Sequence, residues 1–254
     1  MGKVSRGQEA WAKVPAITLG FWVIKIFATT LGETGGDFLS MSLGLGYLPS
    51  TLIFGLIFLI AIFFQIRARA FQPFLYWLTI VATTTLGTTL ADFTTRSIGL
   101  GYSGGSTLLL VLVLGSLGFW KKCTGSIAVD RVNDAKSEWF YWLTIMFSQT
   151  LGTAAGDWTA DTLDCGYLGS AGIFGALLLM VAILYWKSSL SRVLLFWAAF
   201  ILTRPLGAVV GDFLDKPLDQ GGLNLSRLTA SLIMAALMMA CGYCFPQRAA
   251  SQNH

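Results

Sequence analysis

The stretch FWVIKIFATTLGETGGDF, residues 21–38, decides the fold because it recurs three times without a gap. The other copies are YWLTIVATTTLGTTLADF from residue 76, YWLTIMFSQTLGTAAGDW from residue 141 and FWAAFILTRPLGAVVGDF from residue 196. In each copy a Trp precedes an Asp by fifteen residues, and the pairs are Trp22 and Asp37, Trp77 and Asp92, Trp142 and Asp157, and Trp197 and Asp212. Self-similarity at a regular spacing indicates a repeat architecture.

The composition indicates a membrane protein. Of the 254 residues, 55% are hydrophobic and only 12% are charged, and the mean hydropathy is +0.68. Soluble domains carry about 25% charged residues. Four nearly uncharged runs each approach the roughly 20 residues that span a bilayer, and they lie at 48–64, 106–120, 168–186 and 228–245. We expect the more polar segments to span it too, at 14–40, 73–95, 138–160 and 193–215.

These features predict an all-α integral membrane protein with eight transmembrane helices, arranged as four parallel two-helix repeats with pseudo-fourfold (2 × 2) symmetry. Each unit has an even number of spans, so all copies cross the membrane in the same direction. Successive repeat Asp residues are separated by 55, 65 and 55 residues, which indicates a unit duplicated twice. The predicted divisions are a cytoplasmic N-terminus at 1–13, repeat 1 at 14–68, repeat 2 at 69–120, a cytoplasmic connector at 121–137, repeat 3 at 138–188, repeat 4 at 189–245 and a cytoplasmic tail at 246–254.

The positive charges predict the orientation. Twelve of the seventeen Lys and Arg residues lie at the N-terminus, after the last span or in the loops that join one repeat to the next. Because positive residues accumulate on the cytoplasmic side, we expect both termini in the cytoplasm and a multi-pass protein of the bacterial inner membrane. This orientation accounts for the net charge of +4 and leaves no support for a nucleic-acid partner. The expected partners are the lipid bilayer and a small ion or solute, and the oligomeric state stays open.

The repeated Asp residues are candidates for binding an ion. In a continuous helix, fifteen residues at a rise of about 1.5 Å place each Asp roughly 22 Å beyond its Trp, so the four carboxylates form a ring toward the outer face. Glu33 lies four residues before Asp37, and Asp157 four before Asp161, so each pair shares one helix face. Polar residues near mid-membrane usually face the bundle interior. The predicted ion- or substrate-binding residues are Asp37, Asp92, Asp157, Asp212, Glu33, Asp161, Thr30, Thr85, Thr150, Gln149 and Arg204.

Oxygen atoms dominate this set, and the four repeat Asp residues are its candidate metal ligands. Oxygen ligands favour hard cations such as Mg²⁺, Mn²⁺ or Ca²⁺, or Na⁺ and protons. The single histidine, His254, is at the C-terminus, which argues against haem or a histidine metal site. Cys241 and Cys244 form a C-x-x-C in an apolar segment, where we interpret them as packing residues. No cofactor is predicted apart from a divalent cation or a proton as the substrate.

A structural interpretation of the same motif stands beside the functional one. Each copy reads Leu-Gly-x-x-x-small-Asp, and small residues four apart let helix backbones approach closely. On this interpretation each Asp ends its helix by accepting hydrogen bonds from loop N–H groups. Arg204 needs a carboxylate, carbonyl or water partner at its depth, and Lys25 either reaches the headgroups or pairs with an inward carboxylate. A Gly nine residues after each Asp is expected to adopt a positive φ in a turn.

The repeat, from FWVIKIFATTLGETGGDFLSMSLGLGY to FILTRPLGAVVGDF, resembles an uncharacterised family of bacterial multi-pass membrane repeat proteins. The resemblance covers residues 15–243 and implies the membrane architecture without an activity. We expect a membrane transporter, with a hard divalent cation such as Mn²⁺ or Mg²⁺ as the leading substrate and proton coupling as one version. The alternative is a non-transporting membrane scaffold that binds partners or lipids. The sequence contains no nucleophile elbow, His cluster or nucleotide-phosphate loop, so we expect no enzyme.

Overall fold

The computed structural model describes residues 12–250, which form an all-helical bundle. These residues contain eight long α-helices, the shortest of 18 residues. They are α1 (Leu19–Asp37), α2 (Tyr47–Arg67), α3 (Pro73–Asp92), α4 (Gly101–Thr124), α5 (Ala135–Asp157), α6 (Gly166–Lys187), α7 (Arg192–Asp215) and α8 (Arg227–Cys244). The predicted helical segments match the observed helices, two to each repeat. His254 and most of the predicted N-terminal division lie outside the described residues.

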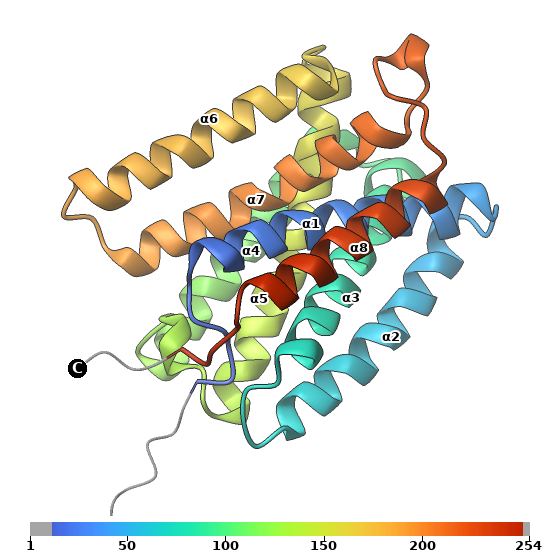
Figure 1. The fold of residues 1–254 in the computed structure, drawn as a ribbon. Coiled ribbons are helices and arrows are strands. Elements are labelled where there is room, and N and C mark those ends of the chain that lie inside the picture. Colours follow the sequence, from blue (N-terminus) through green and yellow to red (C-terminus); the bar gives the residue numbers. More distant parts are fainter. Residues whose placement is uncertain (1–11, 251–254) are drawn as a thin grey trace, which may run out of the picture.

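The first helices of the four repeats form the centre of the bundle. Helices α1, α3, α5 and α7 pack in a closed circle, in which α1 contacts α3 and α7, and α5 contacts the same two. Each second helix lies outside this inner ring and packs on the first helix of the next repeat, so that α2 covers α3, α4 covers α5 and α6 covers α7. Helix α8 packs on α1, so the last repeat covers the first (Figure 1).

Small residues let the inner helices approach one another. A Cβ atom added at Gly32 would lie 1.7 Å from Thr84 Oγ1 on α3, and one added at Gly152 would lie 2.1 Å from Arg204 Cγ on α7. The equivalent glycines of α3 and α7 meet α5 and α1 in the same way. Each Leu-Gly pair therefore packs against the following repeat, and the predicted packing seam is confirmed. We call these four contacts the glycine seam.

The outer helices present apolar side chains to their surroundings. Leu52 is 66% exposed on α2, Val111 is 62% exposed on α4 and Met239 is 70% exposed on α8. Extended apolar surface of this kind is typical of an interaction with lipid. Within residues 12–250, six helices are long and apolar enough to cross a membrane, namely α2, α3, α4, α6, α7 and α8. These helices mark the chain as a membrane protein, in which the more polar α1 and α5 belong to the inner ring.

The first three inner helices each continue into a π-helical turn after the repeat Asp, at Phe38–Ser42, Phe93–Ser97 and Trp158–Thr162. Glycine then reverses the chain, and φ is +79° at Gly46, +67° at Gly101, +61° at Gly166 and +82° at Gly221. Gly adopts such left-handed backbone without steric cost, so the predicted positive φ is confirmed. The predicted capping is wrong in the described part of the chain, where the Asp carboxylates pair with side-chain cations instead of loop N–H groups.

Aromatic residues close the opposite end of the inner ring. Tyr76 and Tyr141 are fully buried, and their hydroxyl oxygens lie 2.7 Å apart. The N-terminal segment packs against this aromatic end, because Val14 is 1% exposed and belongs to the same hydrophobic core. Pro15 forms an antiparallel bridge with Ala249. The two ends of the described chain therefore meet at one end of the bundle.

Candidate functional site

The four repeat Asp residues are buried at the other end of the inner ring, and each is between 2% and 4% exposed. Two cations divide them into pairs. Arg96 lies 3.1 Å from Asp92 and 3.2 Å from Asp157. Lys216 Nζ lies 3.3 Å from Asp37 Oδ2 and 3.0 Å from Asp212 Oδ1. Each cation follows its own Asp by four residues, so it shares that helix face and also reaches the Asp of the following repeat.

Three carboxylates gather at one corner of this end. Glu33, Asp37 and Asp212 each offer an oxygen within 4.8 Å of the other two, and all three side chains are buried. We call this group the acidic cluster. Asp37 Oδ1 is buried and has no hydrogen-bond partner. Asp92 and Asp157 lie outside the cluster, so the structure brings together two of the four predicted metal ligands and adds Glu33.

The buried charges at this end do not balance. Three cations, Arg96, Lys216 and Arg227, pair with the carboxylates here, and Arg227 lies 2.9 Å from Asp215 and 3.7 Å from Asp37. Five aspartate carboxylates are buried beside them, the four repeat Asp residues and Asp215, while the buried Glu33 is neutralised by Arg204. Two formal negative charges are left over when all five are ionised. Because unpaired buried charge is costly, this end of the bundle can accept a cation or take up protons.

Arg204 pairs with Glu33 on the inner side of the acidic cluster. Arg204 is fully buried, and its Nη2 atom lies 2.8 Å from Glu33 Oε2. The same nitrogen donates to Thr88 Oγ1 at 2.7 Å and to the Thr153 hydroxyl. The prediction that Arg204 needs a carboxylate, carbonyl or water partner is confirmed, and the partner is the carboxylate of Glu33. Thr88 and Thr153 were not among the predicted site residues, although the aligned repeats place both in the column of Glu33, which is the signal that identifies them.

The remaining predicted site residues do not join the acidic cluster. Each of the three predicted threonines donates its hydroxyl to the backbone carbonyl four residues earlier in its own helix. The pairs are Thr30 with Ile26, Thr85 with Val81 and Thr150 with Met146. Gln149 is fully buried, and neither of its amide atoms has a partner. Asp161 is exposed and accepts a hydrogen bond from Tyr102 at 3.2 Å.

Lys25 is a second fully buried cation of the inner ring. Its Nζ atom donates to the Phe200 carbonyl and to Thr203 Oγ1, both at 3.1 Å, and lies 3.9 Å from the centre of the Phe200 ring. The prediction that Lys25 reaches the headgroups is wrong, because α1 is enclosed by its neighbours. No carboxylate of the described residues pairs with it either.

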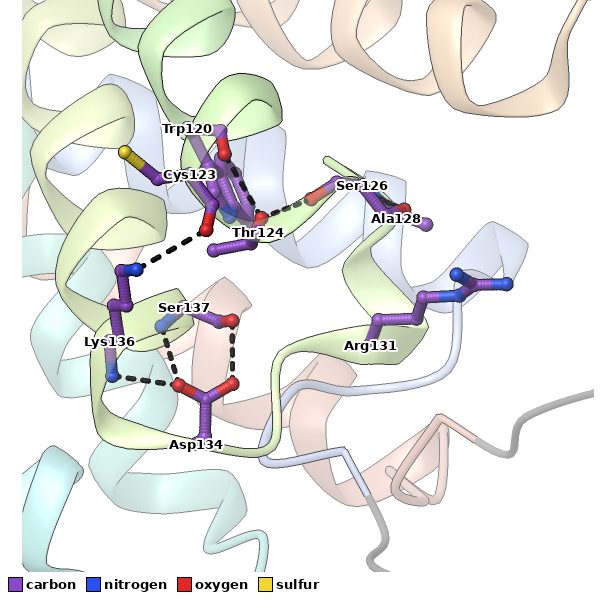
Figure 2. Close-up of a pocket in the computed structure, with 9 residues that line it drawn as sticks. All are labelled: Trp120, Cys123, Thr124, Ser126, Ala128, Arg131, Asp134, Lys136 and Ser137. Carbon is purple, nitrogen blue, oxygen red and sulfur yellow. Dashed lines mark hydrogen bonds between the residues drawn. The ribbon is translucent and has the colours of Figure 1, made fainter.

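A pocket at the connector between α4 and α5 is the other candidate (Figure 2). Its volume is about 290 Å³, and Trp120, Arg131 and Asp134 are among its lining residues. Asp134 caps α5 by accepting hydrogen bonds from the backbone N–H groups of Lys136 and Ser137. Partial burial raises the pKa of Asp134, but a hydrogen bond from the Ser137 hydroxyl, together with those two backbone N–H groups, outweighs it and lowers the pKa below its ordinary value. The acid is thus engaged in a structural role.

The comparisons with known proteins agree with the repeat structure. A family model described as Repeat of Unknown Function (DUF347) matches four stretches of the chain, at residues 20–71, 75–125, 140–191 and 195–245. Each match contains one inner helix and the outer helix that follows it. No curated protein and no solved structure matches.

Proposed function

Since the chain belongs to the family of proteins built from this repeat of unknown function, we propose that it is a membrane transporter for a hard divalent cation such as Mn²⁺ or Mg²⁺. The acidic cluster is the observation that carries the proposal. Three buried carboxylates within 4.8 Å supply the oxygen ligands that hard cations prefer. The unpartnered Asp37 Oδ1 is an acceptor that a bound cation would satisfy. We propose transport and no enzymatic activity.

The charge balance supports a cation site. Two formal negative charges remain at the Asp end after the three nearby cations are counted, one beside the pair of Asp92 and Asp157 and one beside Asp37, Asp212 and Asp215, so a cation at the acidic cluster lowers the excess charge. The same excess can be removed by protons, so exchange of a metal ion for protons is consistent with the site. Intramembrane carboxylates commonly mark such ion pathways.

The proposed topology places this site near the outer face. All eight helices span the inner membrane, both termini are cytoplasmic, and α1 and α5 keep their polar residues away from lipid within the inner ring. Lys216 is 13% exposed and lies between Asp37 and Asp212. An ion that binds at the acidic cluster therefore has to displace this ammonium group from the two carboxylates.

A non-transporting scaffold is the second candidate. The observation in its favour is that all four repeat Asp residues are in salt bridges that join neighbouring repeats. Together with the glycine seam, these bridges could serve assembly alone. If the protein is a scaffold, substitution of any of the four repeat Asp residues should have a similar effect. If the acidic cluster transports an ion, substitution of Asp37 or Asp212 should have a larger effect on transport than substitution of Asp92 or Asp157.

That difference sets the experiment. The full chain is reconstituted in liposomes and Mn²⁺ entry is followed with an enclosed fluorescent indicator. We expect Asp37→Asn and Asp212→Asn to abolish Mn²⁺ flux, and Asp92→Asn to retain most of it, because Asp92 is an equally buried repeat Asp outside the cluster. Thermal unfolding of the three variants controls for folding. Absence of Mn²⁺ flux in the unmodified protein, or equal flux in all three folded variants, rejects the proposal.

A further inference from the structure

Arg204 makes an uneven set of contacts at the inner side of the acidic cluster. Its Nη2 atom meets Glu33, Thr88 and Thr153, whereas its Nε and Nη1 atoms are buried without a partner. A guanidinium has five N–H donors in a fixed plane, so most of its donors are unused. Glu33 is the only carboxylate of the described residues that pairs with it, and this ion pair therefore dominates its environment.

Glu33 belongs to two groups at once. Its carboxylate is the partner of Arg204, and it also lies within 4.8 Å of the carboxylates of Asp37 and Asp212. A metal ion at the cluster and the guanidinium are both cations that need the same oxygen lone pairs. Full coordination of the metal ion by Glu33 therefore weakens the pair with Arg204.

The sequence places this pair at a single corner of the inner ring. The column of Glu33 holds Thr88, Thr153 and Ala208 in the other repeats. The column of Arg204 holds Thr29, Thr84 and Gln149. The acidic residue and the basic residue each break the repeat pattern, and they meet beside the one three-carboxylate group of the described residues.

We propose that Arg204 is the tethered counter-ion of the metal site and competes with the bound metal ion for Glu33. The inference rests on the proposed transport function. With the site empty, Arg204 neutralises Glu33. When a divalent ion binds, Glu33 turns to the metal, and the guanidinium keeps its contacts with Thr88 and Thr153. The free energy of this ion pair is therefore subtracted from the affinity of the site for the metal ion.

The test measures Mn²⁺ binding to the full chain in detergent, from the electron paramagnetic resonance signal of free Mn²⁺. We expect Arg204→Gln to bind Mn²⁺ about tenfold more tightly than the unmodified protein, a change of about 1.4 kcal/mol. Lys25→Gln is the matched control, because Lys25 is an equally buried cation of the inner ring without a carboxylate partner among the described residues.

A second comparison separates the ion pair from a general electrostatic effect. Glu33→Gln removes the acid alone. The double variant, Glu33→Gln with Arg204→Gln, removes the acid together with its basic partner. If Arg204 acts by holding Glu33, the change at Arg204 alters Mn²⁺ affinity by less than about twofold in the Glu33→Gln background, since the competition is then absent. A gain of equal size in both backgrounds overturns the proposal.

The remaining outcomes are also decisive. Unchanged or weaker Mn²⁺ binding by folded Arg204→Gln overturns the inference and leaves the cation site standing. If that variant does not fold, Arg204→Lys replaces it, because lysine keeps the charge and loses the planar reach of the guanidinium. Mn²⁺ binding by Arg204→Lys that is no tighter than that of the unmodified protein is then the contrary result. No Mn²⁺ binding by the unmodified protein or by Asp92→Asn removes the proposed function itself, and this inference with it.

Discussion

Gly207→Ala should loosen the contact between α7 and α1 that supports the acidic cluster. A Cβ atom at residue 207 would lie 2.6 Å from Thr29 Cβ and 3.0 Å from the Thr29 carbonyl carbon. An ordinary contact begins near 3.4 Å, so α1 has to move by roughly 0.8 Å, the difference between 3.4 Å and 2.6 Å. Because Thr29 Cβ and the carbonyl carbon are fixed to the backbone, rotation of the Thr29 side chain cannot relieve the clash.

The expected net loss of stability is up to about 2 kcal/mol. Overpacking of this kind costs about 1 to 3 kcal/mol, and the better helix propensity of Ala returns about 1 kcal/mol. The matched control is Gly172→Ala on the outer helix α6, where an added Cβ meets nothing within 4 Å. This control should gain stability, since only the propensity term acts there.

Thermal unfolding in detergent, followed by tryptophan fluorescence, measures both variants. Gly207→Ala should melt below the unmodified protein and Gly172→Ala at or above it. Combining Gly207→Ala with Thr29→Gly removes the clashing Cβ and should recover part of the loss. Equal melting temperatures for the two single variants would refute the reasoning, because the glycine seam would then not determine how closely the inner helices pack.

Three further predictions concern other parts of the chain. Lys216→Gln removes the ammonium group from Asp37 and Asp212 and should raise Mn²⁺ affinity by about tenfold. The reason is that a hydrogen bond to a charged group is worth about 1.5 to 3 kcal/mol. Unchanged binding in a Mn²⁺ titration contradicts this prediction. Asp134→Ala should lower stability by about 1 kcal/mol through loss of the α5 cap. Because the folded pKa of Asp134 is lowered, this stabilisation is complete above the unfolded value of about 4 and is lost as the pH falls through the folded pKa. The melting difference from the unmodified protein should therefore shrink at low pH. A circular permutant that joins residues 12 and 250 and opens the connector at residues 125–128 should still form the helical bundle. The reason is that the two ends of the described chain already meet at Pro15 and Ala249. Loss of cooperative thermal unfolding in the permutant contradicts this prediction.

Local patterns in the sequence predicted the helices and the turns well. The helix pairs, the glycine seam and the positive φ of Gly46 all follow from residues close together in the chain, because helix periodicity and backbone conformation are local properties. The prediction that each repeat Asp caps its helix was wrong, and the reason lies in the neighbouring sequence. Arg96 and Lys216 each follow their Asp by four residues, and a cation one turn later competes directly with loop N–H groups for the carboxylate.

The contacts between side chains in the site could not be predicted from the spacing of residues along the chain. The pairing of Glu33 with Arg204 joins the first repeat to the last, and it follows only from the order of helices in the inner ring. The division of the four repeat Asp residues into two pairs also depends on the order of the helices, because Arg96 and Lys216 each reach the Asp of the following repeat. Lys25 was misplaced for the same reason, since its burial depends on neighbours that are distant in the chain.

The packing of each outer helix on its neighbour's inner helix restricts how this architecture can vary. A lone repeat has no surface on which to bury its second helix, and its first helix has no cover. Removing one unit from the chain would leave one inner helix bare in lipid unless the circle reclosed with three members and a tighter curvature. A change in the number of repeats is therefore expected only in steps that let the circle of inner helices close again, and not by the gradual addition of single helices.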